Sequence, residues 1–231
     1  MPGSANLKQY WNNLVRLKDL ISLIPKDRWD YKLYTSDLKG RKSTSYSKWG
    51  GFMSDVYHFD PLFFGISPRE AEIMDPQQRL FLQTTWEVIE DAGYKPSDLS
   101  GTDTGIFVGC TGTDFLDVLH ESNHDIEAHS ISGISRTIIP NRISYLLNLH
   151  GPSAVIDTAC SSSLVSIHRA VNSILSGECS MAIAGGTNVI LSPVAQDALS
   201  KSNMLSSDGR CKVFDKSANG YVREKGLQQF Y

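Results

Sequence analysis

The stretch "SAVIDTACSSSLVSIHRAVNSILSGECSMAIAGG", residues 153–186, decides the fold class. Its β-branched opening, residues 153–159, predicts a strand, and residues 161–177 predict a helix that ends at Gly177. Residues 180–186 predict a second strand. A strand, helix, strand unit joins two parallel strands through a right-handed crossover. The sequence therefore predicts an α/β fold.

Helical patterns precede this unit. Apolar residues at i, i+3, i+4 and i+7 predict an amphipathic helix at the start of the chain: Leu7, Tyr10, Trp11 and Leu14. A loop-rich segment follows, from about residue 25 to about residue 60. A capping box with proline, Ser67–Glu70, and the pair Asp75–Pro76 each predict a helix start. The second of these helices is expected to end at Gly93.

Two more segments complete the pattern. "TGIFVG", residues 104–109, predicts a short buried strand, and residues 131–149 predict helical pieces around Pro140. No internal repeat and no low-complexity linker occurs in the sequence. The elements are therefore those of a layered α/β architecture.

Composition limits the function classes. The 231 residues, 41% hydrophobic and 20% charged, are enough for a globular chain with a sizeable core. A net charge of -3 predicts no nucleic-acid partner, and a small basic cluster is interpreted as a solvated loop: Lys39, Arg41, Lys42 and Lys48. The sequence opens without the pattern of a signal peptide and has no apolar run of membrane-spanning length, so no membrane association is expected. Four scattered cysteines favour a reducing, cytoplasmic setting over a disulfide scaffold.

Cys160 lies at the seam between the predicted strand and the predicted helix. Apolar residues at helical spacing predict that one face of this helix is buried against the sheet: Leu164, Ile167, His168, Val171, Ile174 and Leu175. Cys160 would then occupy the first turn, where unpaired N–H groups and the helix dipole favour a thiolate. The residues alone leave two interpretations of Cys160 open, a nucleophile or a small buried hydrophobe.

The other candidate residues give weaker evidence of a functional site. His168 follows Cys160 by eight residues, about 12 Å along a helix that rises about 1.5 Å per residue, so it is predicted to be a packed or hydrogen-bonded core histidine. Cys110 follows the strand at 104–109 without a helix pattern directly after it, and we interpret it as structural. The G-x-S-x-G motif of a serine hydrolase is absent, and no His/Asp pattern supports a thiol hydrolase.

Five sequence motifs resemble those of one known family and occur in the same order. They are "DPQQRLFLQTTWEVIEDAGY", "NRISYLLNLHGPS", "DTACSSSLVSIHRA", "AIAGGTNVIL" and "FDKSANGYVR". Together they are similar to the β-ketoacyl synthase (ketosynthase) domain of modular type I polyketide synthases, from Pro2 to about Arg223. The stretch from His129 to Ser153 is most similar to bacterial assembly lines whose acyltransferase acts in trans.

The resemblance implies a thiolase-like fold of two related α/β halves, of which this sequence matches the amino-terminal one, in a homodimer. It implies that Cys160 is the nucleophile that accepts an acyl chain from the phosphopantetheine thioester of an acyl carrier protein. Two histidines of the second half would then assist decarboxylation of a carrier-bound malonyl unit, whose carbanion attacks the Cys160 thioester. Backbone N–H groups, that of Cys160 included, would hold the oxyanion. No directly bound cofactor or metal is implied.

The histidine motifs of the family's second half do not occur among the six histidines of this sequence. Residues 1–223 are therefore expected to form an incomplete ketosynthase domain. Residues 224–231 depart from the family pattern, and one lost base near the Arg223 codon would explain them as an out-of-frame tail. An alternative function is a truncated, condensation-inactive acyl-binding or interaction fragment. In either case, we expect an exposed apolar face where the second half would pack.

Overall fold

The computed structural model describes residues 1–34, 45–112, 114–122, 130–224 and 226–230. The chain forms two compact units. The first comprises Met1–Asp55, Asp114–Ser122 and Ile190–Gly226, and the second comprises Val56–Thr113, Asn123–Val189 and Leu227–Tyr231. The predicted strand, helix, strand unit lies in the second.

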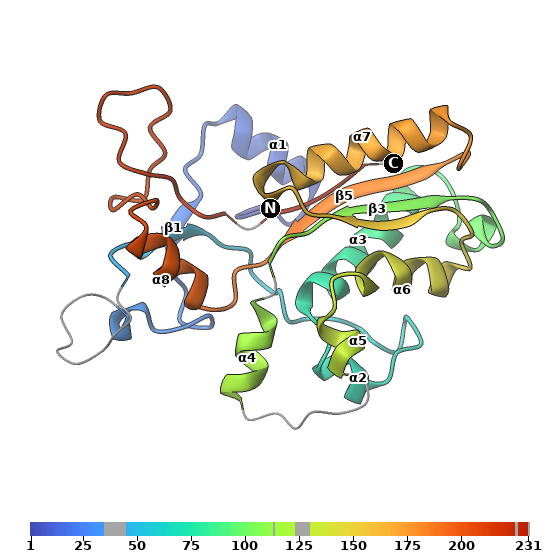
Figure 1. Ribbon diagram of the computed structural model, residues 1–231, viewed down its shortest axis with the longest axis horizontal. Coiled ribbons are helices and arrows are strands. Elements are labelled where there is room, and N and C mark those ends of the chain that lie inside the picture. The colour runs from blue at the N-terminus through green and yellow to red at the C-terminus, as the bar shows by residue number, and fades with distance from the viewer. Residues whose placement is uncertain (35–44, 113, 123–129, 225, 231) are drawn as a thin grey trace. The chain divides into compact units, whose positions relative to one another are not determined.

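A four-stranded sheet, in the order β4-β3-β5-β6, forms the centre of the second unit (Figure 1). Its strands are β3 (Gly105–Gly109), β4 (Ser153–Ile156), β5 (Ala182–Asn188) and β6 (Gly226–Phe230). β3 pairs in parallel with both β4 and β5, so the two strands of the predicted unit are parallel with β3 between them. The prediction of an α/β fold with parallel strands is confirmed.

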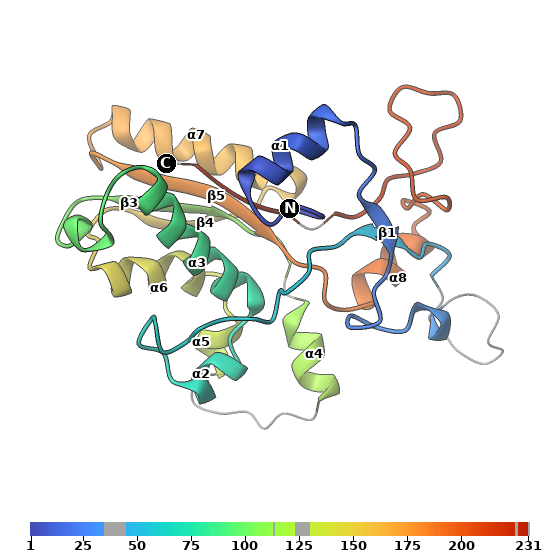
Figure 2. The same ribbon diagram turned by 180° about the vertical axis from the view of Figure 1, so that it is seen from behind.

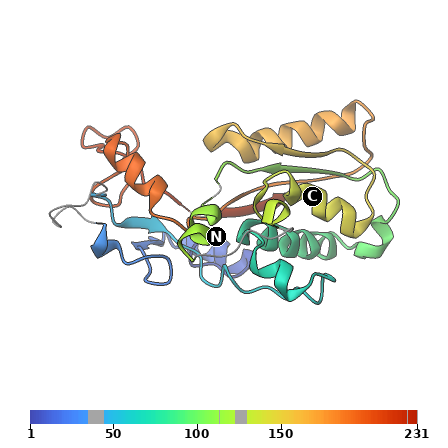
Figure 3. The ribbon, with the colours of Figure 1, turned by 60° about the horizontal axis from the view of Figure 1, so that its bottom comes forward.

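Helices cover both faces of this sheet. α7 (Ser162–Leu175) lies on one face, while α3 (Pro76–Asp91) and α6 (Ile138–Leu147) lie on the other (Figures 2 and 3). The main apolar core lies between the sheet and these two helices, because α3 contributes Phe81 and Ile89 to a buried cluster that also holds Ile143 of α6. The layers are those expected from the sequence.

The predicted helix starts are confirmed. Ser67 Oγ accepts the N–H of Glu70 at 3.1 Å and begins α2 (Pro68–Glu72). Asp75 accepts the N–H of Gln77 at 2.8 Å and begins α3. Gly93 has a φ of +84° just beyond the end of α3, a conformation that favours glycine.

The helical pieces around Pro140 are α5 (Ser130–Ile134) and α6. Pro140 occupies the first turn of α6. Backbone N–H groups in a first turn have no partner within the helix, so the N–H that proline lacks costs no helix hydrogen bond. Asn148 ends α6 in the left-handed conformation with a φ of 51°. The interruption that the proline suggested therefore lies at the beginning of the helix and does not break it.

The first unit contains less regular structure. α1 (Leu7–Val15) and α8 (Val194–Lys201) are its longer helices, and β1 (Ile21–Leu23) pairs antiparallel with β2 (Trp49–Gly51). Short elements complete the chain: η1 (Tyr31–Leu33) and α4 (Phe115–Glu121) here, and η2 (Pro96–Leu99) in the second unit. The opening helix is confirmed. The described part of the loop-rich segment, residues 25–34 and 45–60, contains only the short elements η1 and β2, and Lys39, Arg41 and Lys42 of the basic cluster lie outside the described residues. Over the described ranges, no helix combines the length and apolar character needed to cross a bilayer.

The prediction for the buried face of α7 holds only for Ile167, which is half-buried and packs against a cluster on the sheet, and is wrong for the other residues. Leu164 and Leu175 are 71% and 80% exposed, and Val171 and Ile174 are exposed as well. His168 is exposed rather than in the core, and its Nε2 lies 3.0 Å from Asn172 Nδ2. The residues buried against the sheet are small: Ser162, Ser166, Ala170 and Ser173.

Small side chains are buried here because the helix lies very close to the sheet. A Cβ on Gly109 would lie 2.6 Å from the backbone of Ser162, and one on Gly186 would lie 2.7 Å from Ser163 Cβ. The Ser166 hydroxyl remains satisfied, since it lies 2.7 Å from the Ser163 carbonyl and 2.9 Å from the Gly185 carbonyl. Leucine has no room on this face of α7.

Candidate active site

Cys160 lies in a single 3₁₀ turn, η3 (Ala159–Ser161), between the end of β4 and the start of α7. Its thiol is exposed. The expected position at the strand-to-helix seam is confirmed, although α7 itself begins only at Ser162. The interpretation of Cys160 as a small buried hydrophobe is wrong, because the side chain is accessible.

The backbone of this turn adopts an uncommon conformation. Ala159, directly before the cysteine, has a φ of +55°, which costs about 1 kcal/mol for a residue with a Cβ. Ser162 compensates on both sides, since its Oγ donates to the Ala159 carbonyl at 2.7 Å and accepts the Thr158 N–H at 2.9 Å. The turn that displays Cys160 is therefore fixed by its own hydrogen bonds.

Asp157 anchors the same turn from the strand side. Its Oδ1 accepts the Ala159 N–H at 3.2 Å and the Thr111 hydroxyl at 3.0 Å. Its Oδ2 lies 2.6 Å from Arg136 Nη1. The hydrogen bond from Arg136 is the main cause that holds the pKa of Asp157 below its usual value, and the bonds from Ala159 and Thr111 add to it. Asp157 is therefore an ionised hydrogen-bond acceptor at neutral pH.

Arg136 connects three segments of the second unit. The same Nη1 that contacts Asp157 donates to the carbonyls of Cys110 at 3.2 Å and Thr111 at 3.0 Å. Arg136 lies between α5 and α6, while both carbonyls follow the end of β3. The exits of two neighbouring strands are thereby held together around the turn that carries Cys160.

The remaining cysteines differ from Cys160. Cys110 is 1% exposed, and burial first of all raises the pKa of its thiol to about 12, so it stays protonated at neutral pH. This agrees with its interpretation as structural. Cys179 is also buried, whereas Cys211 is exposed and its Sγ accepts the N–H of Val222 at 3.3 Å.

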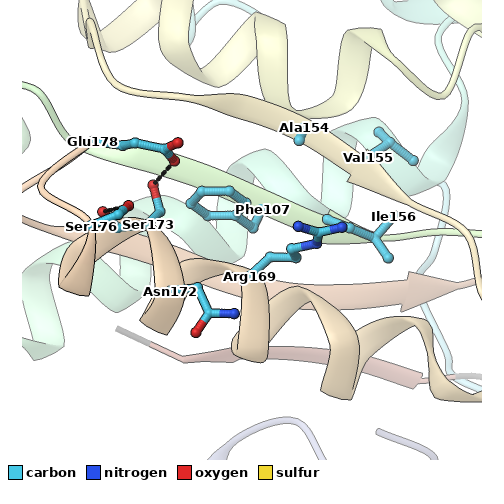
Figure 4. Close-up of a pocket in the computed structure, with 9 residues that line it drawn as sticks. All are labelled: Phe107, Ala154, Val155, Ile156, Arg169, Asn172, Ser173, Ser176 and Glu178. Carbon is cyan, nitrogen blue, oxygen red and sulfur yellow. Dashed lines mark hydrogen bonds between the residues drawn. The ribbon is translucent and has the colours of Figure 1, made fainter.

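A cavity of about 480 Å³ lies beside α7 and the edge strand β4 (Figure 4). Its polar lining includes Arg169, Asn172 and Glu178, and the Glu178 carboxylate accepts the Ser173 hydroxyl at 2.9 Å. Cys160 does not line this cavity. Among the described residues, no group of three or more His, Cys, Asp and Glu side chains could hold a metal ion.

The sequence pointed to Cys160 but not to Arg136 and Thr111, which contact the Asp157 carboxylate in its turn. These residues are 21 and 46 positions away from Asp157, and neither belongs to a spacing pattern that marks a site. The available signal was indirect. Parallel neighbouring strands end at the same edge of a sheet, so polar residues after β3 and β4 are expected to meet there.

A comparison with known families identifies the family of the chain. The model described as "Beta-ketoacyl synthase, N-terminal domain" matches residues 1–227. The chain belongs to the β-ketoacyl synthase family. This confirms the resemblance inferred from the five motifs.

Individual relatives of this β-ketoacyl synthase chain support the same family assignment. Polyketide synthase PksN of Bacillus subtilis (strain 168) is 48% identical over 225 residues, which is 97% of this chain and 4% of that protein. A ketosynthase from module 6 of the bacillaene synthase from Bacillus subtilis 168 matches with a TM-score of 0.86 and 40% identity, covering 99% of this chain and 37% of the solved one. The oxazolomycin ketosynthase domain OzmH KS7 of Streptomyces albus JA3453 gives a TM-score of 0.87 and 40% identity over 96% of this chain and 39% of that one. The fold is the thiolase-like α/β fold of ketosynthases, and the chain spans well under half of each solved domain.

Proposed function

We propose that this chain is the amino-terminal half of a ketosynthase domain that elongates polyketide chains, with Cys160 as its acyl-accepting nucleophile. The observation that carries the proposal is the exposed thiol on a hydrogen-bonded turn between β4 and α7. An accessible thiol at such a turn, close to a helix start, is placed for nucleophilic attack. The family match supplies the reaction class.

In the acylation step, the Cys160 thiolate attacks the carbonyl carbon of an acyl thioester on the phosphopantetheine arm of an acyl carrier protein. A sulfur–carbon bond forms, and the tetrahedral intermediate collapses with release of the phosphopantetheine thiolate, which takes up a proton. Backbone N–H groups, that of Cys160 included, hold the oxyanion. The acyl chain remains on Cys160 as a thioester.

In the condensation step, a carrier-bound malonyl unit loses carbon dioxide, and the resulting carbanion attacks the Cys160 thioester. A carbon–carbon bond forms, and the cysteine leaves as a thiolate. Two histidines of the complete domain assist this step, and their motifs do not occur in the present sequence. We assign acylation to residues of this chain and condensation to the complete domain, which we propose is a homodimer.

The partners and setting follow from the same proposal. Substrates arrive on phosphopantetheine, so no directly bound cofactor or metal is needed. Four free cysteines support a reducing, cytoplasmic location. The Bacillus relatives are consistent with an assembly line whose acyltransferase acts in trans.

We propose that residues 1–223 are the half-domain and that its missing half covers the exposed apolar side of α7. That side carries Leu164, Val171, Ile174 and Leu175, each at least 42% exposed. Apolar side chains grouped on one helix face favour burial by a second surface. Residues 224–231 remain an out-of-frame tail in this proposal, and coding DNA that cannot yield the family sequence after a one-base shift would refute it.

A second candidate is a condensation-inactive fragment that at most acylates itself on Cys160. The two candidates differ in the coding DNA after the Gly220 codon. Histidine motifs in a restored frame support the elongating domain, whereas a stop without further family sequence supports the fragment.

The function is tested by incubating the full chain with the butyryl thioester of phosphopantetheine and measuring the intact mass. We expect one added butyryl group in the unaltered chain and in Cys211→Ala, which removes the other exposed thiol. Cys160→Ala is expected to lose the modification. Acylation that persists in Cys160→Ala contradicts the assignment of the nucleophile.

A further inference from the structure

Beyond the nucleophile itself, the structure indicates how its turn is controlled electrostatically. The Asp157 carboxylate accepts the Ala159 N–H at 3.2 Å, one residue before Cys160. A carboxylate in that place stabilises the turn but also opposes a thiolate nearby, because like charges disfavour each other. The site therefore needs a cation that neutralises Asp157 without displacing it.

Arg136 meets both requirements. Its Nη1 lies 2.6 Å from Asp157 Oδ2, on the oxygen that the Ala159 N–H does not use. Its two carbonyl contacts after β3 fix where the guanidinium lies. About a third of the Arg136 side chain and 41% of the Asp157 side chain are exposed, so this pair contributes little to stability by itself.

Other charges at this end of the sheet are few among the described residues. Asp75 at the start of α3 acts there together with Arg136 and Asp157, since the same three groups influence the buried Cys110 thiol. Asp75 has a cation of its own, because it interacts electrostatically with Arg79. Arg136 is the cation that pairs with Asp157, so its removal leaves the Asp157 carboxylate uncompensated.

We propose that Arg136 is a positioning residue for Cys160: it fixes the Asp157 carboxylate as the anchor of the turn and cancels its charge beside the thiolate. This inference rests on the proposed function, in which the thiolate is the reactive form. Arg136 acts only through Asp157 and the turn.

The test measures the alkylation rate of Cys160 by iodoacetamide in the full chain from pH 6 to pH 9, by peptide mass spectrometry. Alkylation consumes the thiolate, so the pH of half-maximal rate reports the charge around the thiol. Asp157 stays ionised throughout this range because its pKa is lowered. Any change in the profile therefore belongs to the thiol.

Arg136→Gln leaves the Asp157 carboxylate uncompensated. We expect the half-maximal pH to rise by about half a unit to one unit, and the rate at pH 7.5 to fall about threefold to tenfold. Asp157→Asn keeps an oxygen for the Ala159 N–H but leaves Arg136 positive, so the half-maximal pH is expected to fall. Opposite shifts are the signature of charge balance, whereas loss of a structural support moves both variants in the same direction.

Two further measurements separate charge from structure. In Arg136→Gln the difference from the unaltered chain should shrink in about 1 M salt, where the Debye length falls to about 3 Å. Arg136→Lys keeps the charge but not the planar fork, and should restore most of the pH profile. Arg142→Gln is the matched control, because Arg142 pairs with Glu70 at 2.6 Å on the same unit without contacting the Cys160 turn. It is expected to lower stability without moving the profile.

Superimposable profiles for Arg136→Gln and the unaltered chain, or shifts of equal sign in Arg136→Gln and Asp157→Asn, would overturn the proposal. If Arg136→Gln does not fold, Arg136→Lys and Asp157→Asn decide the same question. Failure of the proposed function is distinguishable: Cys160 would then show the predicted alkylation shifts but no butyryl transfer. Butyryl transfer with unshifted profiles would refute this inference alone.

Discussion

In α7 the buried face is small and mostly polar and the exposed face is apolar, which is the reverse of what hydrophobicity suggests. The face against the sheet carries serines and an alanine, while Leu164 and Leu175 on the other side are mostly exposed. The small side chains of the inner face allow the helix to lie directly against glycine positions of β3 and β5. The outer face has the apolar character of a surface that another layer covers. Burial in this helix is therefore decided by distance to the sheet and not by apolar area.

Among the variants that test the two faces of α7, Gly109→Ala is expected to lower stability most. The new Cβ would lie 2.6 Å from backbone atoms of Ser162 and Ser163, which cannot move without displacing the start of α7. We expect a loss of about 3 kcal/mol in the free energy of unfolding, measured by urea denaturation. Gly101→Ala is the control, since a Cβ there has nothing within 4 Å and only its φ of +78° opposes it, at about 1 kcal/mol. Equal losses in the two variants would contradict close packing at Gly109.

Ser166 tests the inner face with a smaller change. Ser166→Leu places a large side chain where the serine is fully buried, and we expect it to cost about 2–3 kcal/mol. Ser166→Ala removes the hydroxyl and its contacts with the Ser163 and Gly185 carbonyls, for about 1 kcal/mol. The informative result is which of the two variants loses more stability. If leucine were tolerated better than alanine, the inner face would be limited by apolar area after all.

The outer face is expected to give the smallest effect on folding. Leu164→Gln together with Leu175→Gln changes exposed side chains, so the free energy of unfolding should shift by less than about 0.5 kcal/mol per residue. Self-association of the chain, followed by sedimentation velocity, should decrease because the apolar face is smaller. A large loss of stability in this double variant would mean that the leucines are buried by the chain itself.

Much of the fold could be predicted from local sequence. Ser67 and Asp75 cap the helices that they were expected to cap, and Gly93 ends α3 through its positive φ, because these effects depend on neighbours within a few residues. The α7 face was predicted wrongly because apolar periodicity says where a helix is apolar and not what lies against it. Serines that bond to carbonyls of their own helix, as Ser166 does with Ser163, can be buried at little cost.

By itself, the sequence determined the strand, helix, strand unit around α7, the place of Cys160 at a strand-to-helix seam, and membership of the ketosynthase family through five ordered motifs. These depend on local backbone preferences and on residue identity. Only the tertiary structure decided which face of α7 meets the sheet and that Arg136 meets Asp157. Both depend on how parallel strands bring distant segments together at one edge, and that proximity is not encoded in the spacing of residues along the chain.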